Sequence, residues 1–248
     1  MSEPPRLFPT TSRTLIQALK APDQKMREMS LARFCTQYYP AIYGYARAMG
    51  LPEADAKDRV QDFFVEVVRD GLLSHYDMER GSRLSSWLMK CFKNLVNSHH
   101  AARSAQKRGG GQEFVELDSE HAEHSFRAAH LAHLDPGPTF DLMLAREIWL
   151  AAKTRLMKKH HDKGNGKLMA DLLPLVLMDR WPLRPMPTQE ELAVRHGTTS
   201  VRIKAFFNRT LRVQAQRFFE EEAQAASPGI PETELDHLWH LLCRYGEV

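Results

Sequence analysis

The sequence predicts an all-α fold of two helical domains joined by a flexible linker, and three observations support this prediction. Apolar residues recur at intervals of three and four along most of the chain, which is the period of an amphipathic helix. No run alternates with the two-residue period of a strand for long enough to indicate a sheet. A stretch rich in Gly, Glu, His and Ala after residue 108 interrupts the helical pattern and indicates a linker.

The first domain is predicted over residues 26–108, after a polar lead-in over residues 1–25 that contains several prolines. Its helices are bounded by glycines, which favour helix ends because they tolerate a positive φ. One helix begins at Met26 and closes at Gly50, and the next two are predicted from Glu53 to Asp70 and from Ser82 to Gln106.

The linker is assigned to residues 109–139, with a helical stretch near residues 121–134. A second helical domain follows over residues 140–222, and its helices are predicted from Phe140 to Lys159 and from Leu168 to Trp181, before a helix-turn-helix. Residues 223–248 form a tail helix. Its apolar face is expected to cap the second domain and consists of Leu235, Leu238, Trp239 and Leu242.

Charge is segregated along the chain, although the formal net charge is only +3. From Arg80 to Arg108 there are seven Lys or Arg residues and no Asp or Glu, and from Leu192 to Phe219 there are six cations and again no acid. Acid-free basic stretches are typical of surfaces that bind a polyanion. Two of them predict two separate contacts with one nucleic acid.

Composition also argues against several other classes of protein. The three cysteines are widely spaced, which predicts neither a disulfide framework nor a paired metal motif. No apolar run is long enough to span a bilayer, so we expect a soluble cytoplasmic protein without membrane contact. We expect no catalytic residues and no cofactor, because no Ser/His/Asp or Cys/His arrangement has sequence support. We also expect no metal, because the linker histidines His121, His124, His130 and His133 lack cysteine partners.

The segment from Thr188 to Phe219 has the pattern of a helix-turn-helix. Thr188 and Glu191 are spaced as a capping box, His196 and Gly197 suit a turn, and the hydroxyls of residues 198–200 offer an N-cap for a second helix. The inward side chains are predicted to be Leu192, Ala193, Ile203, Phe206 or Phe207, Thr210, Leu211 and Val213. The side chains predicted to enter a DNA major groove are Thr199, Ser200, Arg202, Lys204, Asn208, Arg209 and Arg212.

Several motifs follow one another along the chain: residues 55–64, Arg80 and Gly81, Ser86 to Leu88, Lys93 and Asn94, residues 105–111 and, last, residues 203–209. Taken in this order they resemble bacterial sigma factors of the sigma-70 family, extracytoplasmic-function type. The first five look like sigma region 2, and residues 203–209 look like region 4. The resemblance covers residues from about 30 to 220. It implies a transcription initiation factor that is not itself an enzyme.

Such a factor would bind core RNA polymerase through its clamp helices and flap, and promoter DNA in double- and single-stranded form. An anti-sigma regulator is a further candidate partner. The polymerase-binding residues implied are Asp58, Gln61, Asp62, Phe63 and Glu66. The residues implied for opening and reading the −10 element are Lys90, Lys93, Asn94, Asn97, Arg103, Lys107 and Arg108, while the helix-turn-helix would bind the −35 element.

Two departures from the family pattern bear on the −10 contact. Relatives usually carry Trp and an Arg pair where this chain has His100, Ala101 and Ala102, and Ser85 stands where a basic residue is common. Both departures predict fewer stacking and phosphate contacts with DNA.

Other interpretations stay open at this point. A stand-alone helix-turn-helix regulator would need no second basic segment and would bind two-fold symmetric sites. A nuclease could use Asp55, Asp58 and Asp62 to hold metal, but no nucleophile-positioning residues accompany them. The acidic row formed by Asp58, Asp62 and Glu66 could also be a solvated helix face, and residues 188–219 could be a plain helical hairpin.

Overall fold

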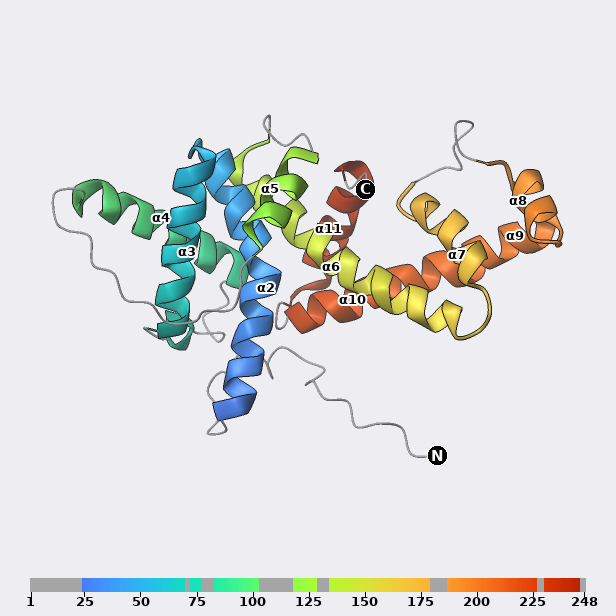
Figure 1. The fold of residues 1–248 in the computed structure, drawn as a ribbon, viewed down its shortest axis with the longest axis horizontal. Coiled ribbons are helices and arrows are strands. Elements are labelled where there is room, and N and C mark those ends of the chain that lie inside the picture. Colours follow the sequence, from blue (N-terminus) through green and yellow to red (C-terminus); the bar gives the residue numbers. More distant parts are fainter. Residues whose placement is uncertain are drawn as a thin grey trace. The chain divides into compact units, whose positions relative to one another are not determined.

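The computed structural model describes residues 24–69, 72–76, 83–102, 118–128, 134–178, 187–226 and 230–245. Within these segments every regular element is helical and no strand occurs, which confirms the predicted all-α class (Figure 1). The chain divides into two compact units, one comprising Met1–Leu144 with Gln224–Pro231 and the other Ala145–Ala223 with Glu232–Val248.

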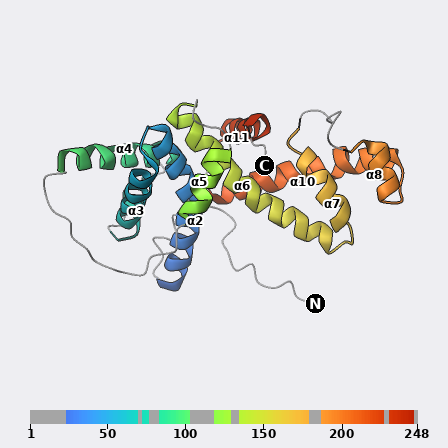
Figure 2. The same cartoon turned by 45° about the horizontal axis from the view of Figure 1, so that its top comes forward.

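The first unit is built around the long helix α2 (Gln24–Ala48), which packs against α3 (Glu53–Arg69), α4 (Leu84–Ala102) and α5 (Ser119–Ala128). The short 3-10 helix η1 (Leu72–His75) follows α3. In both views α4 runs across α3, and α5 lies along α2 (Figure 1 and Figure 2). As predicted, the chain turns after α2 at Gly50, whose φ of 90° suits glycine.

Aromatic side chains fill the core of the first unit. Phe63 of α3 meets Phe92 of α4 with 5.6 Å between the ring centroids, and Tyr38 of α2 lies 6.5 Å from Phe140, near the start of α6 (Pro136–His161). Edge-on and tilted ring pairs of this kind contribute packing energy beyond the area they bury. The core therefore joins residues that are about 100 positions apart in the sequence.

A glycine lets α2 approach the first turns of α6. A Cβ atom on Gly44 would lie only 2.7 Å from Cγ of Met143, so a larger residue would push the Met143 side chain away. The start of α6 is thus part of the first unit, while its remaining turns belong to the second.

The segment predicted as a linker contains a packed helix. Helix α5 buries Ala122 and Phe126, and its Glu123 is only 6% exposed. This helix overlaps the helical stretch anticipated near residues 121–134 but begins earlier, and it packs on α2, so residues 118–128 belong to the first unit.

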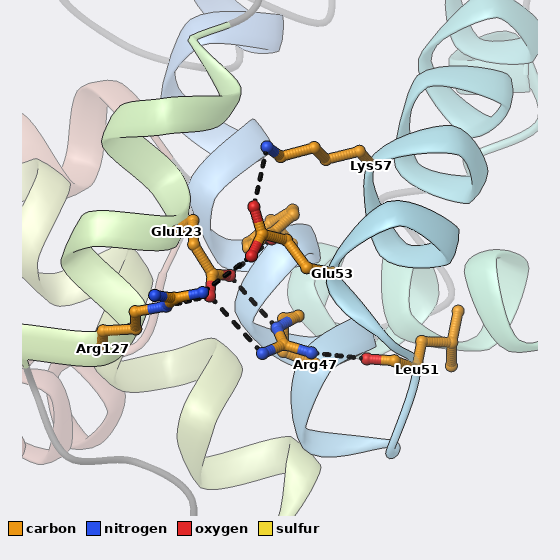
Figure 3. A network of polar contacts seen from close by, with 7 residues as sticks. Arg47, Leu51, Glu53, Lys57, Glu123 and Arg127 are labelled. Atoms are coloured by element: carbon orange, nitrogen blue, oxygen red, sulfur yellow. Dashed lines mark hydrogen bonds and ion pairs between the residues drawn. The ribbon is translucent and has the colours of Figure 1, made fainter.

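A polar network holds α5 against α2 and the beginning of α3 (Figure 3). Glu123 accepts hydrogen bonds from Tyr43 and Arg47 of α2 and from Arg127 of its own helix. Arg127 also donates to Glu53 at 2.7 Å, and Lys57 donates to the other oxygen of Glu53 at 3.0 Å. A buried carboxylate is stable here because several donors replace the water that it loses.

The second unit contains the rest of α6, then α7 (Gly166–Leu172), the 3-10 helix η4 (Leu173–Leu175), α8 (Gln189–Arg195), α9 (Ser200–Phe206), the π segment η5 (Phe207–Leu211), α10 (Arg212–Ala226) and α11 (Glu232–Tyr245). The end of α10, from residue 224 on, belongs to the first unit. There the carbonyl of Ala226 accepts a hydrogen bond from Tyr38 at 3.0 Å.

The C-terminal helix α11 packs on the second unit, as its apolar face predicted. The Trp239 ring lies 6.0 Å from Trp149 of α6 and 5.1 Å from Phe219 of α10, and Leu238 and Leu242 are fully buried. Over the described part of the chain, no helix combines the length and the apolar character needed to cross a membrane.

Candidate nucleic-acid interface

The helix-turn-helix forms as its local sequence predicted. The Thr188 hydroxyl accepts a hydrogen bond from the Glu191 amide, and the Glu191 carboxylate accepts one from the Thr188 amide, which completes the capping box of α8. Gly197 in the turn has a φ of 59°. Thr199 then caps α9, because its hydroxyl accepts a hydrogen bond from the Arg202 amide at 3.3 Å.

The outer side of the second helix carries the polar side chains predicted for DNA. Arg202, Lys204, Asn208 and Arg209 are exposed, while Leu192, Ala193, Ile203, Phe207 and Leu211 face inward. No Asp or Glu interrupts this surface, because the sequence from Leu192 to Phe219 contains none. The surface can therefore attract phosphate and present an amide and two guanidinium groups to base edges.

Two residues assigned to DNA have another role in the structure. The Thr199 hydroxyl is engaged in the cap of α9. Arg212 is half-buried, donates to the carbonyl of Met178 at 2.9 Å and lies over the Phe207 ring. Both residues support the shape of the motif, and Ser200 is half-buried as well.

The prediction that Val213 faces the core is wrong, since 59% of its surface is exposed. The π segment from Phe207 to Leu211 explains the difference. A π turn contains more residues than an α turn, so the buried positions along this helix come four residues apart, and Val213 is not one of them. The buried residues along this line are Ile203, Phe207, Leu211, Ala215 and Phe219.

An acidic residue outside the motif fixes the turn between its two helices. Asp171 of α7 accepts a hydrogen bond from Arg195 at 2.8 Å and pairs with Nε2 of His196 at 2.7 Å. Burial alone raises the pKa of the Asp171 carboxyl, but the hydrogen bonds from His196 and Arg195 outweigh this effect and lower it. Sequence reasoning missed this anchor, because the partners are 24 and 25 residues apart.

A second cationic surface lies on α4. Lys90, Lys93, Asn94 and Asn97 are all exposed, whereas Leu84, Leu88, Phe92, Leu95 and Val96 are buried. Positions 86, 90, 93 and 97 follow the spacing of one helix face. The structure therefore brings the four predicted residues together on one side of α4, next to the exposed Ser86.

The structure describes only some of the other residues that bear on the predicted −10 contact. Arg103, Lys107 and Arg108 lie outside the described residues, as do the side chains of His100, Ala101 and Ala102. Ser85 is buried, with 3% of its surface exposed, so this serine does not itself belong to the cationic face of α4. Trp87 is half-buried, and its ring centroid lies 5.4 Å from that of Tyr76, so the side chain is partly used in packing.

The acidic residues predicted to bind polymerase lie on the outer side of α3. Asp58 and Gln61 are exposed, and Asp62 and Glu66 are partly exposed. Asp62 also accepts a hydrogen bond from Arg59 at 2.7 Å, which offsets part of the repulsion between Asp62 and the neighbouring carboxylates Asp58 and Glu66. Phe63 was also predicted to bind polymerase, but it is fully buried against Phe92 and so does not form part of an exposed docking surface.

Within the described residues, no group of three or more His, Cys, Asp or Glu side chains is arranged to hold a metal ion.

Comparison with known proteins gives one finding for the first unit. The family model for sigma-70 region 2 matches residues 34–106, which cover most of α2, all of α3 and all of α4. No curated protein and no solved structure matches the chain. The matched segment carries both the acidic face of α3 and the cationic face of α4. Residues 34–106 are therefore similar to sigma-70 region 2, and the rest of the chain lies outside this match.

Proposed function

We propose that this protein is a sigma factor of the extracytoplasmic-function type, which binds core RNA polymerase and directs it to promoters through −10 and −35 elements. The match to sigma-70 region 2 over residues 34–106 carries the proposal. The exposed face of α4 lies inside that match and supports the proposal further, because it presents cations and amides without any acid.

In this proposal α4 holds the single-stranded −10 element. Lys90 and Lys93 neutralise phosphates, while Asn94 and Asn97 donate to and accept from base edges. All four are exposed on one helix face, which is the arrangement that contact along a strand requires. Stacking by aromatic side chains plays a smaller part here, since Trp87 is half-buried beside Tyr76.

Helix α3 would dock on the clamp helices of the polymerase. Its outer side carries Asp58, Asp62 and Glu66, and three of the first six residues of α3 are acidic. A carboxylate row of this kind suits a basic partner surface. Phe63 supports this row from the core and takes no part in the contact itself.

The helix-turn-helix of the second unit would bind the −35 element. Arg202, Lys204, Asn208 and Arg209 supply the major-groove and phosphate contacts. The capping box of α8 and the cap of α9 support the proposal, because they set both helices in the order that the motif requires. The flap of the polymerase would be the protein partner of this unit.

Run-off transcription with purified core RNA polymerase and bacterial genomic fragments tests the proposal. We expect the protein to form a stable complex with the polymerase and to produce transcripts that the core enzyme alone does not make. If neither complex nor transcript appears, a stand-alone helix-turn-helix regulator describes the protein better.

The docking surface is tested by an Asp62→Asn, Glu66→Gln double variant in a pull-down with core polymerase. We expect weaker polymerase binding with unchanged binding to upstream duplex DNA. Glu232→Gln on α11, an exposed acid outside the matched segment, is the control and should behave as the wild type. Wild-type affinity in the double variant would show that this face of α3 is not the docking surface.

A further inference from the structure

The exposed side of α9 contains an apolar side chain that the proposed contacts leave unused. Val201, the second residue of α9, has 75% of its surface exposed. Positions 201, 204, 205 and 208 are spaced at three, four and seven residues, so they lie on one helix face. Val201 and Ala205 therefore occupy the same face as Lys204 and Asn208, and the exposed Arg202 and Arg209 lie beside it.

Neither solvation nor helix formation explains a valine at this position. An exposed position in the first turn favours polar residues, and a β-branched side chain loses rotamer freedom in a helix. The core of the motif does not use Val201 either, because Ile203 and Phe207 fill the inward positions. A single exposed apolar residue is ordinary on a protein surface, but this one is surrounded by cations on the helix that would enter the groove.

From this arrangement we infer that Val201, with Ala205 beside it, contacts the C5-methyl group of a thymine in the major groove. Thymine is the only base that presents a methyl group there, and apolar side chains are its usual partners. The flanking Arg202, Lys204 and Arg209 place this apolar strip against a polyanion, which argues for DNA rather than a protein partner. Val201 is thus a specificity-determining residue for the upstream element.

This inference rests on the proposed function, because it requires that α9 bind duplex DNA. It adds a defined chemical feature: the element read by α9 includes a thymine whose methyl group lies under Val201. Asn208 lies two turns further along the same face and suits an adenine, whose N6 and N7 it can pair with. The recognised element should therefore contain thymine and adenine within a few base pairs of each other.

The test uses the full chain in complex with core RNA polymerase and a duplex pool randomised over the upstream half of the promoter. Thymines in the selected element are then replaced one at a time by deoxyuridine, which removes only the methyl group. At one thymine the wild-type complex should lose affinity about fourfold, the change expected for one buried methyl group. The Val201→Ala complex should lose most of this difference between the two duplexes, because it keeps only a single methyl group at this position.

Two exposed valines provide matched controls. Val194 on α8 and Val213 on α10 are 84% and 59% exposed, and neither lies on α9. Val194→Ala and Val213→Ala should keep the wild-type sensitivity to deoxyuridine. Circular dichroism of each variant checks that α9 remains folded.

Three outcomes would overturn the inference. The first is that no deoxyuridine substitution changes the affinity of the wild-type complex. The second is that Val201→Ala keeps the full sensitivity to the missing methyl group. The third is that the complex selects no upstream element at all, and this outcome alone also contradicts the proposed function of the helix-turn-helix.

Discussion

The hydroxyl of Tyr43 on α2 donates a hydrogen bond to Glu123 on α5, which lies 80 residues later in the sequence. The same carboxylate accepts from Arg47 at 3.1 Å and from Arg127. Burial alone raises the pKa of the Glu123 carboxyl, but hydrogen bonds from Tyr43 and Arg127 and the charge of Arg47 outweigh it, so the pKa is lowered. The pKa of Tyr43 is raised by burial and by its bond to Glu123.

Replacing Glu123 by Gln should destabilise the first unit by about 2 kcal/mol, because an amide cannot accept from Tyr43, Arg47 and Arg127 together as the buried carboxylate does. The free energy of unfolding, measured by urea denaturation, checks this expectation. Glu120→Gln on the exposed side of α5 is the control and should change it by less than about 0.5 kcal/mol. Equal effects of the two substitutions would mean that the network does not hold α5 in place.

The lowered pKa of Glu123 also predicts a pH dependence. A carboxyl group whose pKa is lower in the folded state contributes stability above its unfolded pKa of about 4.3, and this contribution is lost as the pH falls through the folded value. The difference in unfolding free energy between the wild type and Glu123→Gln should therefore shrink below about pH 4.3. A difference that stays constant down to about pH 2 would contradict this interpretation.

Asp171→Asn should loosen the turn of the helix-turn-helix, since it removes the charge that holds Arg195 and His196. We expect a loss of about 1 kcal/mol in the stability of the second unit, because this pair is partly exposed and screened. Thermal unfolding measures the effect. Asp236→Asn on the exposed side of α11 should leave the transition unchanged, and an unchanged transition in Asp171→Asn as well would argue against the anchor.

Trp239→Ala should destabilise the second unit by about 2 to 3 kcal/mol, because the ring packs between Trp149 and Phe219 and its removal leaves a cavity. Near-ultraviolet circular dichroism during denaturation follows the loss of these aromatic contacts. His240→Ala, an exposed neighbour on α11, is the matched control. If both variants have the same free energy of unfolding as the wild type, then α11 does not contribute to the stability of the second unit.

Arg209→Ala and Lys204→Ala should weaken binding to upstream duplex DNA, and a substitution that removes a phosphate contact should lower the salt dependence of the binding constant by about one unit per contact. Affinities measured over a range of salt concentrations separate phosphate contacts from base contacts. Arg217→Ala, a cation further along α10 that pairs with Glu221 at 2.8 Å, should leave both quantities unchanged. A uniform loss in all three variants would point to nonspecific attraction.

Local features of the fold could be predicted because nearby residues determine them. The capping box of Thr188 and Glu191, the turn at Gly197 and the cap at Thr199 each depend on side chains within three positions of one another. The apolar spacing of α3 and α4 likewise separates a buried face from a polar one. For these elements the sequence pattern and the structure agree.

Features that depend on distant residues were not accessible in the same way. Glu123 stood in a stretch with a polar composition typical of a linker, and nothing near it indicated that Tyr43 and Arg47 would surround it. The π segment changed the side on which Val213 emerges. Phe63 was grouped with its acidic neighbours, although its place in the apolar stripe of α3 already indicated burial.

Because α5 packs on α2, insertions between α4 and α5 lengthen a connection inside the first unit. Both helices belong to the first unit, so residues 103–117 begin and end in the same unit. Insertions between α4 and α5 lengthen a connection whose two ends lie in one unit, and each doubling of a flexible connection's length costs only about 0.6 kcal/mol of entropy. The two units are instead connected within α6, at Leu144 and Ala145, and near the C-terminus. Under the proposed function, lengthening the chain between α4 and α5 should therefore leave the connection between the two DNA-binding units unchanged.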